Sequence, residues 1–139
     1  MNILILGNGG REHTFCWKLS QSVLKPKLFI APGNAGTAQL GTNIEINPTD
    51  LEAVAKAVSS HAIDLILVGP EAPLVAGIHD YIGNHPTLSH IPVIGPKEEA
   101  AQLEGSKAYA KAFMERHKIP TAPYKQFDKQ SLNCLSNCL

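Results

Sequence analysis

Four short apolar runs constrain the fold of this chain more than any other feature of its sequence. They are residues 2–6 (NILIL), 27–31 (KLFIA), 63–68 (IDLILV) and 91–94 (IPVI), none with a regular polar alternation. Such runs are typical of strands that are covered on both faces, as in a parallel sheet. Residues 43–47 (NIEIN) do alternate, and we expect a strand there that lies nearer the edge of the sheet.

The segments between these runs have the spacing of amphipathic helices. In one segment, apolar residues fall at i, i+3, i+4 and i+7, namely Leu51, Val54, Ala55 and Val58. Thr49 and Glu52 have the spacing of a capping box for the start of this helix. Strands that alternate with helices, joined by turns rich in glycine and proline, predict an α/β fold. We expect a doubly wound, Rossmann-like parallel sheet with helices on both faces.

The chain is expected to divide near residue 103. The last apolar run ends at Ile94, and the following residues have the pattern of two helices separated at Gly105 and Ser106. Ser106 is a suitable N-cap for the second of these helices. We therefore expect one domain over residues 1–103 and the start of another over residues 104–139.

The C-terminal tail predicts that this second domain is incomplete. Leu132, Leu135 and Leu139 share one face of a helical pattern that ends without a capping glycine or a partner element. We therefore expect the chain to be the front part of a longer protein.

The three cysteines favour free thiols. Cys16, Cys134 and Cys138 lie in patterns with helical spacing, and no histidine or acid accompanies the last two at the spacing of a metal site. We therefore expect neither a metal site nor the disulfide framework of a small secreted protein.

Charge and hydropathy exclude several classes of partner. The chain has 12 basic and 12 acidic residues, so it lacks the net positive charge with which proteins bind nucleic acid or an anionic membrane. Its N-terminal apolar run is too short for a signal peptide, and no segment approaches the ~20 apolar residues of a membrane span. We expect a cytoplasmic, monomeric protein that binds small molecules, with no nucleic-acid or membrane partner.

Four loops that follow the expected strands are rich in glycine and proline. They are GNGGREH (7–13), APGNAGT (31–37), GPEAPL (69–74) and GPKEEA (95–100). In a parallel α/β sheet, the loops that leave the carboxyl ends of the strands open on one edge, where ligands bind. The four loops together predict a ligand site at this edge.

The first loop is suited to holding a phosphate. Gly7, Gly9 and Gly10 allow main-chain amides to approach an anion at the start of a helix that we expect from about residue 11 to residue 21. Arg11 would add a charge-assisted hydrogen bond worth ~1.5–3 kcal/mol. In the alternative interpretation, the glycines only turn the chain, and Arg11 and Glu12 are solvated.

The same loop departs from the dinucleotide-binding fingerprint. That fingerprint requires a third glycine at position 12 and an acid at the end of the second strand, where this chain has Glu12 and the sequence Ala31-Pro32-Gly33. Both departures disfavour NAD or FAD as the ligand. They favour a smaller polar ligand such as a sugar monophosphate.

Glu71 and Lys107 are further candidates, each with two open interpretations. Glu71 lies between two prolines at a strand end. In one interpretation, its carboxylate accepts hydrogen bonds from sugar hydroxyls or an amine. In the other, it is only a favourable acid in the first turn of the next helix. Lys107 falls in the first turn of a helix, where a cation opposes the helix dipole by ~0.3–1 kcal/mol unless a phosphate is bound. The alternative for Lys107 is an exposed lysine whose charge is offset by Glu104.

The motifs GNGGREH, APGNAGTA, VGPEAPLVAGI and AAQLEGSKAYAKAFMERHKIPTA, in this order and spacing, resemble the N-terminal part of the phosphoribosylamine–glycine ligases. The resemblance runs from Met1 to about Tyr124. It implies an ATP-grasp enzyme of purine synthesis, in which ATP phosphorylates glycine and the amine of 5-phosphoribosylamine attacks the glycyl phosphate to give glycinamide ribonucleotide. It also implies ATP as co-substrate and Mg2+ or Mn2+ as the metal, with the metal ligands downstream of this chain.

The resemblance also implies roles for particular residues. It places eight residues near phosphoribosylamine: Gly9, Gly10, Arg11, Glu12, Gly33, Asn34, Pro70 and Glu71. It assigns Lys107 to ATP, because the helix that follows Gly105 resembles the entry to an ATP-grasp domain.

The resemblance implies no catalytic residue within the chain. Because enzymes lower reaction barriers by ~8–23 kcal/mol, we expect residues 1–139 alone to be inactive. Two alternatives remain. One is a stand-alone module that binds a sugar phosphate or a nucleotide without catalysis. The other is part of a dinucleotide-dependent oxidoreductase, which Glu12 disfavours.

Overall fold

The computed structural model describes residues 1–125 and 127 and divides the chain into two compact units, Met1–Gly105 and Ser106–Leu139. Each unit is described by itself. The expected helical face of Leu132, Leu135 and Leu139, and the expected free thiols of Cys134 and Cys138, lie outside the described residues.

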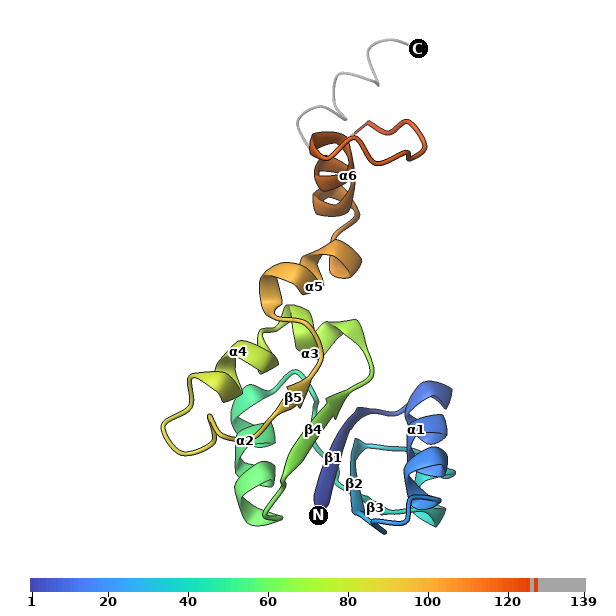
Figure 1. Ribbon diagram of the computed structural model, residues 1–139, viewed down its shortest axis with the longest axis vertical. Coiled ribbons are helices and arrows are strands. Elements are labelled where there is room, and N and C mark those ends of the chain that lie inside the picture. The colour runs from blue at the N-terminus through green and yellow to red at the C-terminus, as the bar shows by residue number, and fades with distance from the viewer. Residues whose placement is uncertain (126, 128–139) are drawn as a thin grey trace. The chain divides into compact units, whose positions relative to one another are not determined.

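The first unit contains a five-stranded parallel sheet with the strand order β3-β2-β1-β4-β5 (Figure 1). The strands are β1 (Asn2–Gly7), β2 (Lys27–Pro32), β3 (Thr42–Asn43), β4 (Leu65–Val68) and β5 (Val93–Ile94). The helices are α1 (Gly10–Ser20), the short 3-10 helix η1 (Thr37–Gln39), α2 (Leu51–Ser60), α3 (Glu71–Val75), α4 (Ile78–Gly83) and α5 (Glu98–Gly105). The predicted α/β fold class is confirmed.

Helices cover both faces of this sheet, as the apolar runs predict. Successive residues of β1 point to opposite faces, so that Ile3 and Ile5 pack on the side of α1 while Leu4 and Leu6 pack on the side of α2 and α4 (Figure 1). All four side chains are at most 1% exposed. Burial on both faces explains why the strand sequences lack a polar alternation.

Cys16 belongs to the core on the α1 side and is a free thiol, as expected. Its side chain is fully buried, and this burial raises the pKa of the thiol to about 11. The thiol is therefore protonated at neutral pH and is a poor nucleophile.

Two local expectations need correction. The alternating run 43–47 forms a strand only at its first residue, and β3 pairs with β2 at the edge of the sheet through Thr42 and Asn43. The chain then turns, because Ile46 N donates to the carbonyl of Ile44 at 2.9 Å, and both isoleucines pack on the core. The alternation thus reflects a loop with two partly buried isoleucine side chains.

The second correction concerns the start of α2. The N-cap is Asp50, whose Oδ1 accepts a hydrogen bond from Ala53 N at 3.0 Å, so Thr49 and Glu52 do not form the predicted capping box. The Thr49 hydroxyl instead donates to Asn47 Oδ1 at 2.9 Å. Threonine and aspartate are both favourable N-cap residues, and this helix uses Asp50, which lies one residue after Thr49.

The second unit contains α6 (Lys107–Arg116) among its described residues. Ser106 caps this helix as predicted, and its Oγ accepts a hydrogen bond from Tyr109 N at 3.3 Å. No helix in the described part of the chain has the length and apolar character needed to cross a membrane.

Candidate functional site

The loop between β1 and α1 presents its main chain to solvent at the carboxyl end of β1. Asn8, Gly9 and Gly10 are exposed, and α1 begins at Gly10, one residue before the predicted start. A Cβ at Gly10 would meet nothing within 4 Å. The first turn of α1 therefore offers main-chain amides without a covering side chain, as the phosphate interpretation requires.

Glu12 points inward from this turn. Its side chain is 4% exposed, and its Oε2 accepts a hydrogen bond of 2.6 Å from Gly9 N. A Cβ at Gly69 would overlap Glu12 Oε1 and would lie 2.6 Å from its Cδ. The interpretation of Glu12 as a solvated residue is therefore wrong, because the carboxylate fills the space between the loop and the end of β4.

Arg11 reaches the end of the neighbouring strand. Its Nη1 donates a hydrogen bond to the carbonyl oxygen of Gly69 at the end of β4, although Arg11 as a residue is exposed. A guanidinium group has five N–H donors, so this bond leaves donors for an anion. Arg11 and Glu12 together connect the first turn of α1 to β4.

The second predicted loop is tied to the first by Asn34. Its Nδ2 donates to the carbonyls of Asn8 at 2.8 Å and Gly9 at 3.3 Å, and its Oδ1 accepts from Gly36 N at 2.8 Å. The side-chain amide thus holds the first loop in place. Its proposed proximity to phosphoribosylamine stays a prediction.

Gly33 starts this loop with a φ of +74°, which favours glycine. Its N–H donates to the carbonyl of Gly7 at 3.2 Å, and a Cβ here would lie 2.5 Å from Asn43 Cγ. The residue therefore brings the ends of β1 and β2 together.

The third predicted loop starts α3. Pro70 is the N-cap of this helix, and Glu71 is its first residue, with an exposed side chain. The structure therefore places Glu71 both at the sheet edge and in a favourable first turn, so both of its interpretations remain open.

A cavity of about 220 Å3 lies where three of the four predicted loops meet the loop after β3. Its lining residues come from the carboxyl ends of β1, β2 and β4 and from residues 47–49. They are Gly7, Asn8, Pro32, Asn47, Pro48, Thr49, Pro70, Ala72 and Pro73. Asn47, Pro48 and Thr49 were not predicted to lie here, because only the folded sheet brings their loop to this edge.

The fourth predicted loop does not line this cavity. In residues 95–100, the carbonyl of Gly95 interacts with His79 Nδ1 at 2.7 Å, and Glu98 N donates to Asp80 Oδ2 at 2.8 Å. These contacts direct the loop toward α4. Three of the four predicted loops therefore line one cavity, and the fourth does not.

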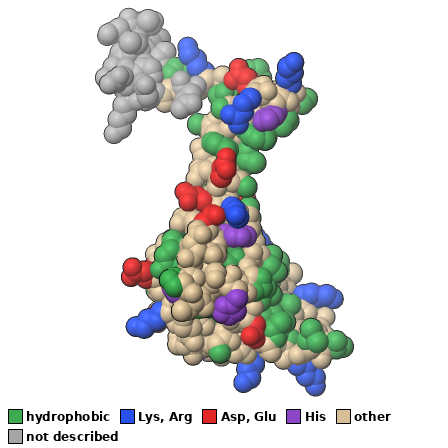
Figure 2. All heavy atoms as spheres, turned by 60° about the vertical axis from the view of Figure 1, so that its left-hand side comes forward, with side chains coloured by type: hydrophobic (Ala, Val, Ile, Leu, Met, Phe, Trp, Pro, Cys, Tyr) green, Lys and Arg blue, Asp and Glu red, His purple; other side chains and the backbone are tan. Residues whose placement is uncertain are grey.

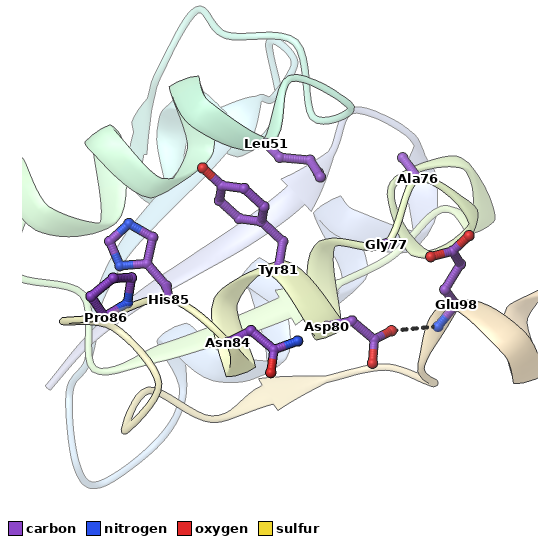
Figure 3. A pocket seen from close by; sticks show the side chains of 9 residues that line it. All are labelled: Leu51, Ala76, Gly77, Asp80, Tyr81, Asn84, His85, Pro86 and Glu98. Atoms are coloured by element: carbon purple, nitrogen blue, oxygen red, sulfur yellow. Dashed lines mark hydrogen bonds between the residues drawn. The ribbon is translucent and has the colours of Figure 1, made fainter.

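A larger hollow in the first unit lies elsewhere. It measures about 560 Å3 and is an open groove bordered by the start of α2, by α4 and by the start of α5 (Figure 3). It contains none of the predicted site residues, and Asp80 in its wall caps the start of α5 (Figure 3). We place the candidate site at the sheet edge, because ligands of open α/β sheets bind beyond the carboxyl ends of the strands.

Charged side chains are interspersed on the first unit. On the face drawn in Figure 2, the Lys and Arg side chains lie singly, with no continuous basic patch among the described residues. An anion at the candidate site would therefore need local groups, such as main-chain amides at the first turn of α1 and the Arg11 guanidinium group.

Lys107 belongs to the second unit. It is exposed at the first position of α6, as predicted, and lines a hollow of about 270 Å3 with Ala108, Lys111, Tyr124 and Lys125. Lys111 Nζ lies 5.7 Å from the centre of the Tyr124 ring. The three lysines make this hollow suitable for an anion, and its use for ATP stays a prediction.

The fold and the loop positions define a class: a Rossmann-like domain whose first loop lies at the switch point between β1 and β4. A family model described as phosphoribosylglycinamide synthetase, N domain, matches residues 1–104. The chain belongs to this family.

Comparison with individual proteins agrees. The chain is 52% identical over 129 residues to the phosphoribosylamine–glycine ligase of Haemophilus influenzae and 49% identical to that of Escherichia coli K12, in each case over 91% of this chain and 29% of the relative. The crystal structure of the Thermotoga maritima ligase is similar with a TM-score of 0.66 and 30% identity, over 99% of this chain and 30% of that one. The chain thus spans less than a third of the length of these relatives.

A more distant likeness concerns the fold alone. The biotin carboxylase domain of a single-chain bacterial carboxylase is similar with a TM-score of 0.62 at 15% identity, over 99% of this chain and 34% of that one. The architecture is therefore shared beyond the ligase family.

Proposed function

We propose that this chain supplies the phosphoribosylamine-binding part of a phosphoribosylamine–glycine ligase. The observation that carries the proposal is the exposed first turn of α1, where Gly10 has open space around it and Arg11 has N–H donors beyond the one bonded to Gly69. Main-chain amides at a helix start and a guanidinium group are both suited to a phosphate. The identity with ligases at about half of the 129 aligned positions supports the choice of reaction.

In the proposed reaction, the carboxylate of glycine attacks the γ-phosphorus of ATP, which gives glycyl phosphate and ADP. The amine of 5-phosphoribosylamine then attacks the acyl carbon, the C–O bond to phosphate breaks, and glycinamide ribonucleotide and phosphate are formed. The described residues would hold the sugar phosphate and orient its amine. Gly33, Asn34 and Pro70 would act by holding the loops together, and Glu71 would accept a hydrogen bond from a hydroxyl or the amine.

ATP is proposed to bind through the second unit, where Lys107 would contact its phosphates. In the described residues, no group of three or more His, Cys, Asp or Glu is arranged to hold a metal ion. We therefore assign the ligands of the proposed Mg2+ or Mn2+ to the part of the relatives that this chain does not span. Residues 1–139 alone are expected to be inactive, and turnover of ATP with glycine by this chain would contradict that expectation.

Titration calorimetry with ribose 5-phosphate, a stable analogue of phosphoribosylamine, tests the binding proposal. Gly10→Asp places a carboxylate at the first position of α1, where an acid favours the helix but repels a phosphate. We expect this variant to bind at least about tenfold more weakly than the wild type.

Gly10→Asn is the matched control, because it has the same shape without the charge and is expected to bind more tightly than Gly10→Asp. NAD is the control ligand and is expected not to bind. Equal affinity of the two variants for ribose 5-phosphate, or binding of NAD alone, would refute the proposed phosphate site.

A further inference from the structure

The first loop contains a pair of residues that is chemically labile. Asn8 and Gly9 form the only Asn-Gly pair in the sequence, and both residues are exposed. Because glycine has no Cβ, its main-chain nitrogen can approach the side chain of a preceding asparagine without steric hindrance. Such a pair is open to spontaneous deamidation, in which water is the only other reactant.

The deamidation of Asn8 would proceed through a cyclic imide. The nitrogen of Gly9 loses its proton to solvent and attacks Cγ of Asn8. The bond from Cγ to Nδ2 breaks, and Nδ2 takes up a proton and leaves as ammonia. Water then adds to one of the two imide carbonyls and breaks the bond from that carbon to the Gly9 nitrogen, which leaves aspartate or isoaspartate at position 8.

The peptide unit that must move in this reaction is held at both ends. The carbonyl of Asn8 and the N–H of Gly9 belong to one planar unit. Asn34 Nδ2 donates a hydrogen bond to this carbonyl at 2.8 Å, and the N–H donates to Glu12 Oε2 at 2.6 Å. The ring closes only if the unit turns and brings the nitrogen onto Cγ of Asn8, so both hydrogen bonds oppose its closure.

Glu12 also opposes the loss of the proton from Gly9. Its carboxylate is 4% exposed and accepts the hydrogen bond from the nitrogen that must become the nucleophile. A negative charge at this distance disfavours a second negative charge on the nitrogen. The folded loop therefore restricts both the geometry of the attack and the deprotonation that precedes it.

We infer that Asn8 is a deamidation site that the hydrogen bonds of Asn34 and Glu12 keep closed while the first loop is folded. Asn8 uses only its main-chain carbonyl in the hydrogen bonds of the described residues, so these residues do not restrain its side-chain amide. Both products add a carboxylate directly before Gly9 and Gly10. Because like charges repel, deamidation lowers the affinity of the loop for a phosphate, and this consequence alone rests on the proposed function.

The rate of deamidation at Asn8 tests the inference without any ligand. The chain is incubated in mildly alkaline buffer, folded or in urea, and the peptide that contains Asn8 is then quantified by mass spectrometry. Asn34→Asp removes the donor to the Asn8 carbonyl but keeps the Oδ1 acceptor, and Glu12→Ala removes the acceptor at the other end of the peptide unit. Asp50→Ala is the matched control, because it also loses one hydrogen bond between a side chain and the main chain but leaves the first loop unchanged.

We expect the folded wild type to deamidate at Asn8 much more slowly than the same chain in urea. Asn34→Asp and Glu12→Ala should each raise the folded rate about tenfold, which is the change in population that corresponds to the loss of one hydrogen bond. Asp50→Ala should keep the wild-type rate. Far-UV circular dichroism establishes that each variant is folded.

Three outcomes would overturn the inference. They are equal rates for the folded and the unfolded wild type, wild-type rates in both Asn34→Asp and Glu12→Ala, and an equal acceleration in all three variants, which would indicate global unfolding as the cause.

The consequence for phosphate binding is measured separately with ribose 5-phosphate. Asn8→Asp reproduces the charge of the deamidated residue and should bind more weakly than Asn8→Ala, which removes the amide without adding a charge. Equal affinity of these two variants would overturn the consequence and leave the deamidation site intact. Failure of the wild type to bind ribose 5-phosphate would overturn the proposed function, whereas the deamidation rates would be unaffected.

Discussion

Gly69→Ala should destabilise the first unit, because the added methyl group displaces a buried carboxylate. The new Cβ would overlap Glu12 Oε1 and would lie 2.6 Å from Cδ and 2.9 Å from Cγ. Restoring a separation of ~3.5 Å between carbon atoms requires the carboxyl group to move by about 1 Å. That movement breaks the 2.6 Å hydrogen bond from Gly9 N to Glu12 Oε2.

The expected cost follows from two opposing terms. A hydrogen bond to a charged group contributes ~1.5–3 kcal/mol, and its loss lowers the free energy of unfolding. Replacing glycine by alanine also restricts the unfolded chain, and this raises the free energy of unfolding by ~0.4–1 kcal/mol. We therefore expect a net loss of ~0.5–2.6 kcal/mol, measured by urea unfolding followed by far-UV circular dichroism.

A double-mutant cycle isolates the contact with Glu12. Glu12→Ala removes the obstructing carboxylate, so Gly69→Ala should cost at least ~1 kcal/mol less in that background than in the wild type. Gly83→Ala is the control, because a Cβ at this helical glycine would meet nothing within 4 Å. Equal unfolding midpoints for Gly69→Ala and Gly83→Ala, or additivity in the cycle, would refute the role of Glu12.

Three further predictions concern the start of α2 and the buried thiol. Asp50→Ala should lower the free energy of unfolding by ~1 kcal/mol, while Thr49→Ala should change it by less than ~0.5 kcal/mol. Urea unfolding measures both values. A larger loss in Thr49→Ala than in Asp50→Ala would support the capping box predicted from sequence. In a Cys134→Ser, Cys138→Ser background, Cys16 should react with iodoacetamide at neutral pH only after unfolding, and rapid labelling of the native chain would contradict its burial. Because burial raises the pKa of Cys16 from 9.0 to about 11, its contribution to stability is complete below pH 9 and is lost as the pH rises toward 11; Cys16→Ser should weaken this alkaline loss of stability.

The strands could be predicted from sequence because their burial on both faces leaves a continuous apolar run, as in β1. The extent of the edge strand β3 could not, because Ile44 and Ile46 are partly buried from a loop and imitate the period of a strand. One feature of the sequence could have predicted that Glu12 points inward. Glu12 lies three residues after the N-cap Gly9, which is the position from which an acid bonds back to the N-cap N–H.

The candidate site was predictable only in part. The first three loops carry glycine and proline patterns that can be recognised one by one, and the structure brings all three to one edge. Asn47 and Thr49 carry no comparable pattern, and their position depends on how the chain returns from β3 to α2. The fourth loop was wrongly expected to join the other three. The strand order brings its start to the same edge, but hydrogen bonds with Asp80 and His79 hold the loop against α4.

The most direct test of the central claim is an amide-detected NMR titration of this chain with ribose 5-phosphate, with NAD as a separate titrant. A phosphate at the first turn of α1 should shift the amide signals of residues 9–12 and of the 69–74 loop with the sugar phosphate alone. Shifts at the same amides with NAD alone would contradict the account and restore the dinucleotide interpretation. An absence of shifts with both ligands would contradict the claim that this domain binds the sugar phosphate by itself.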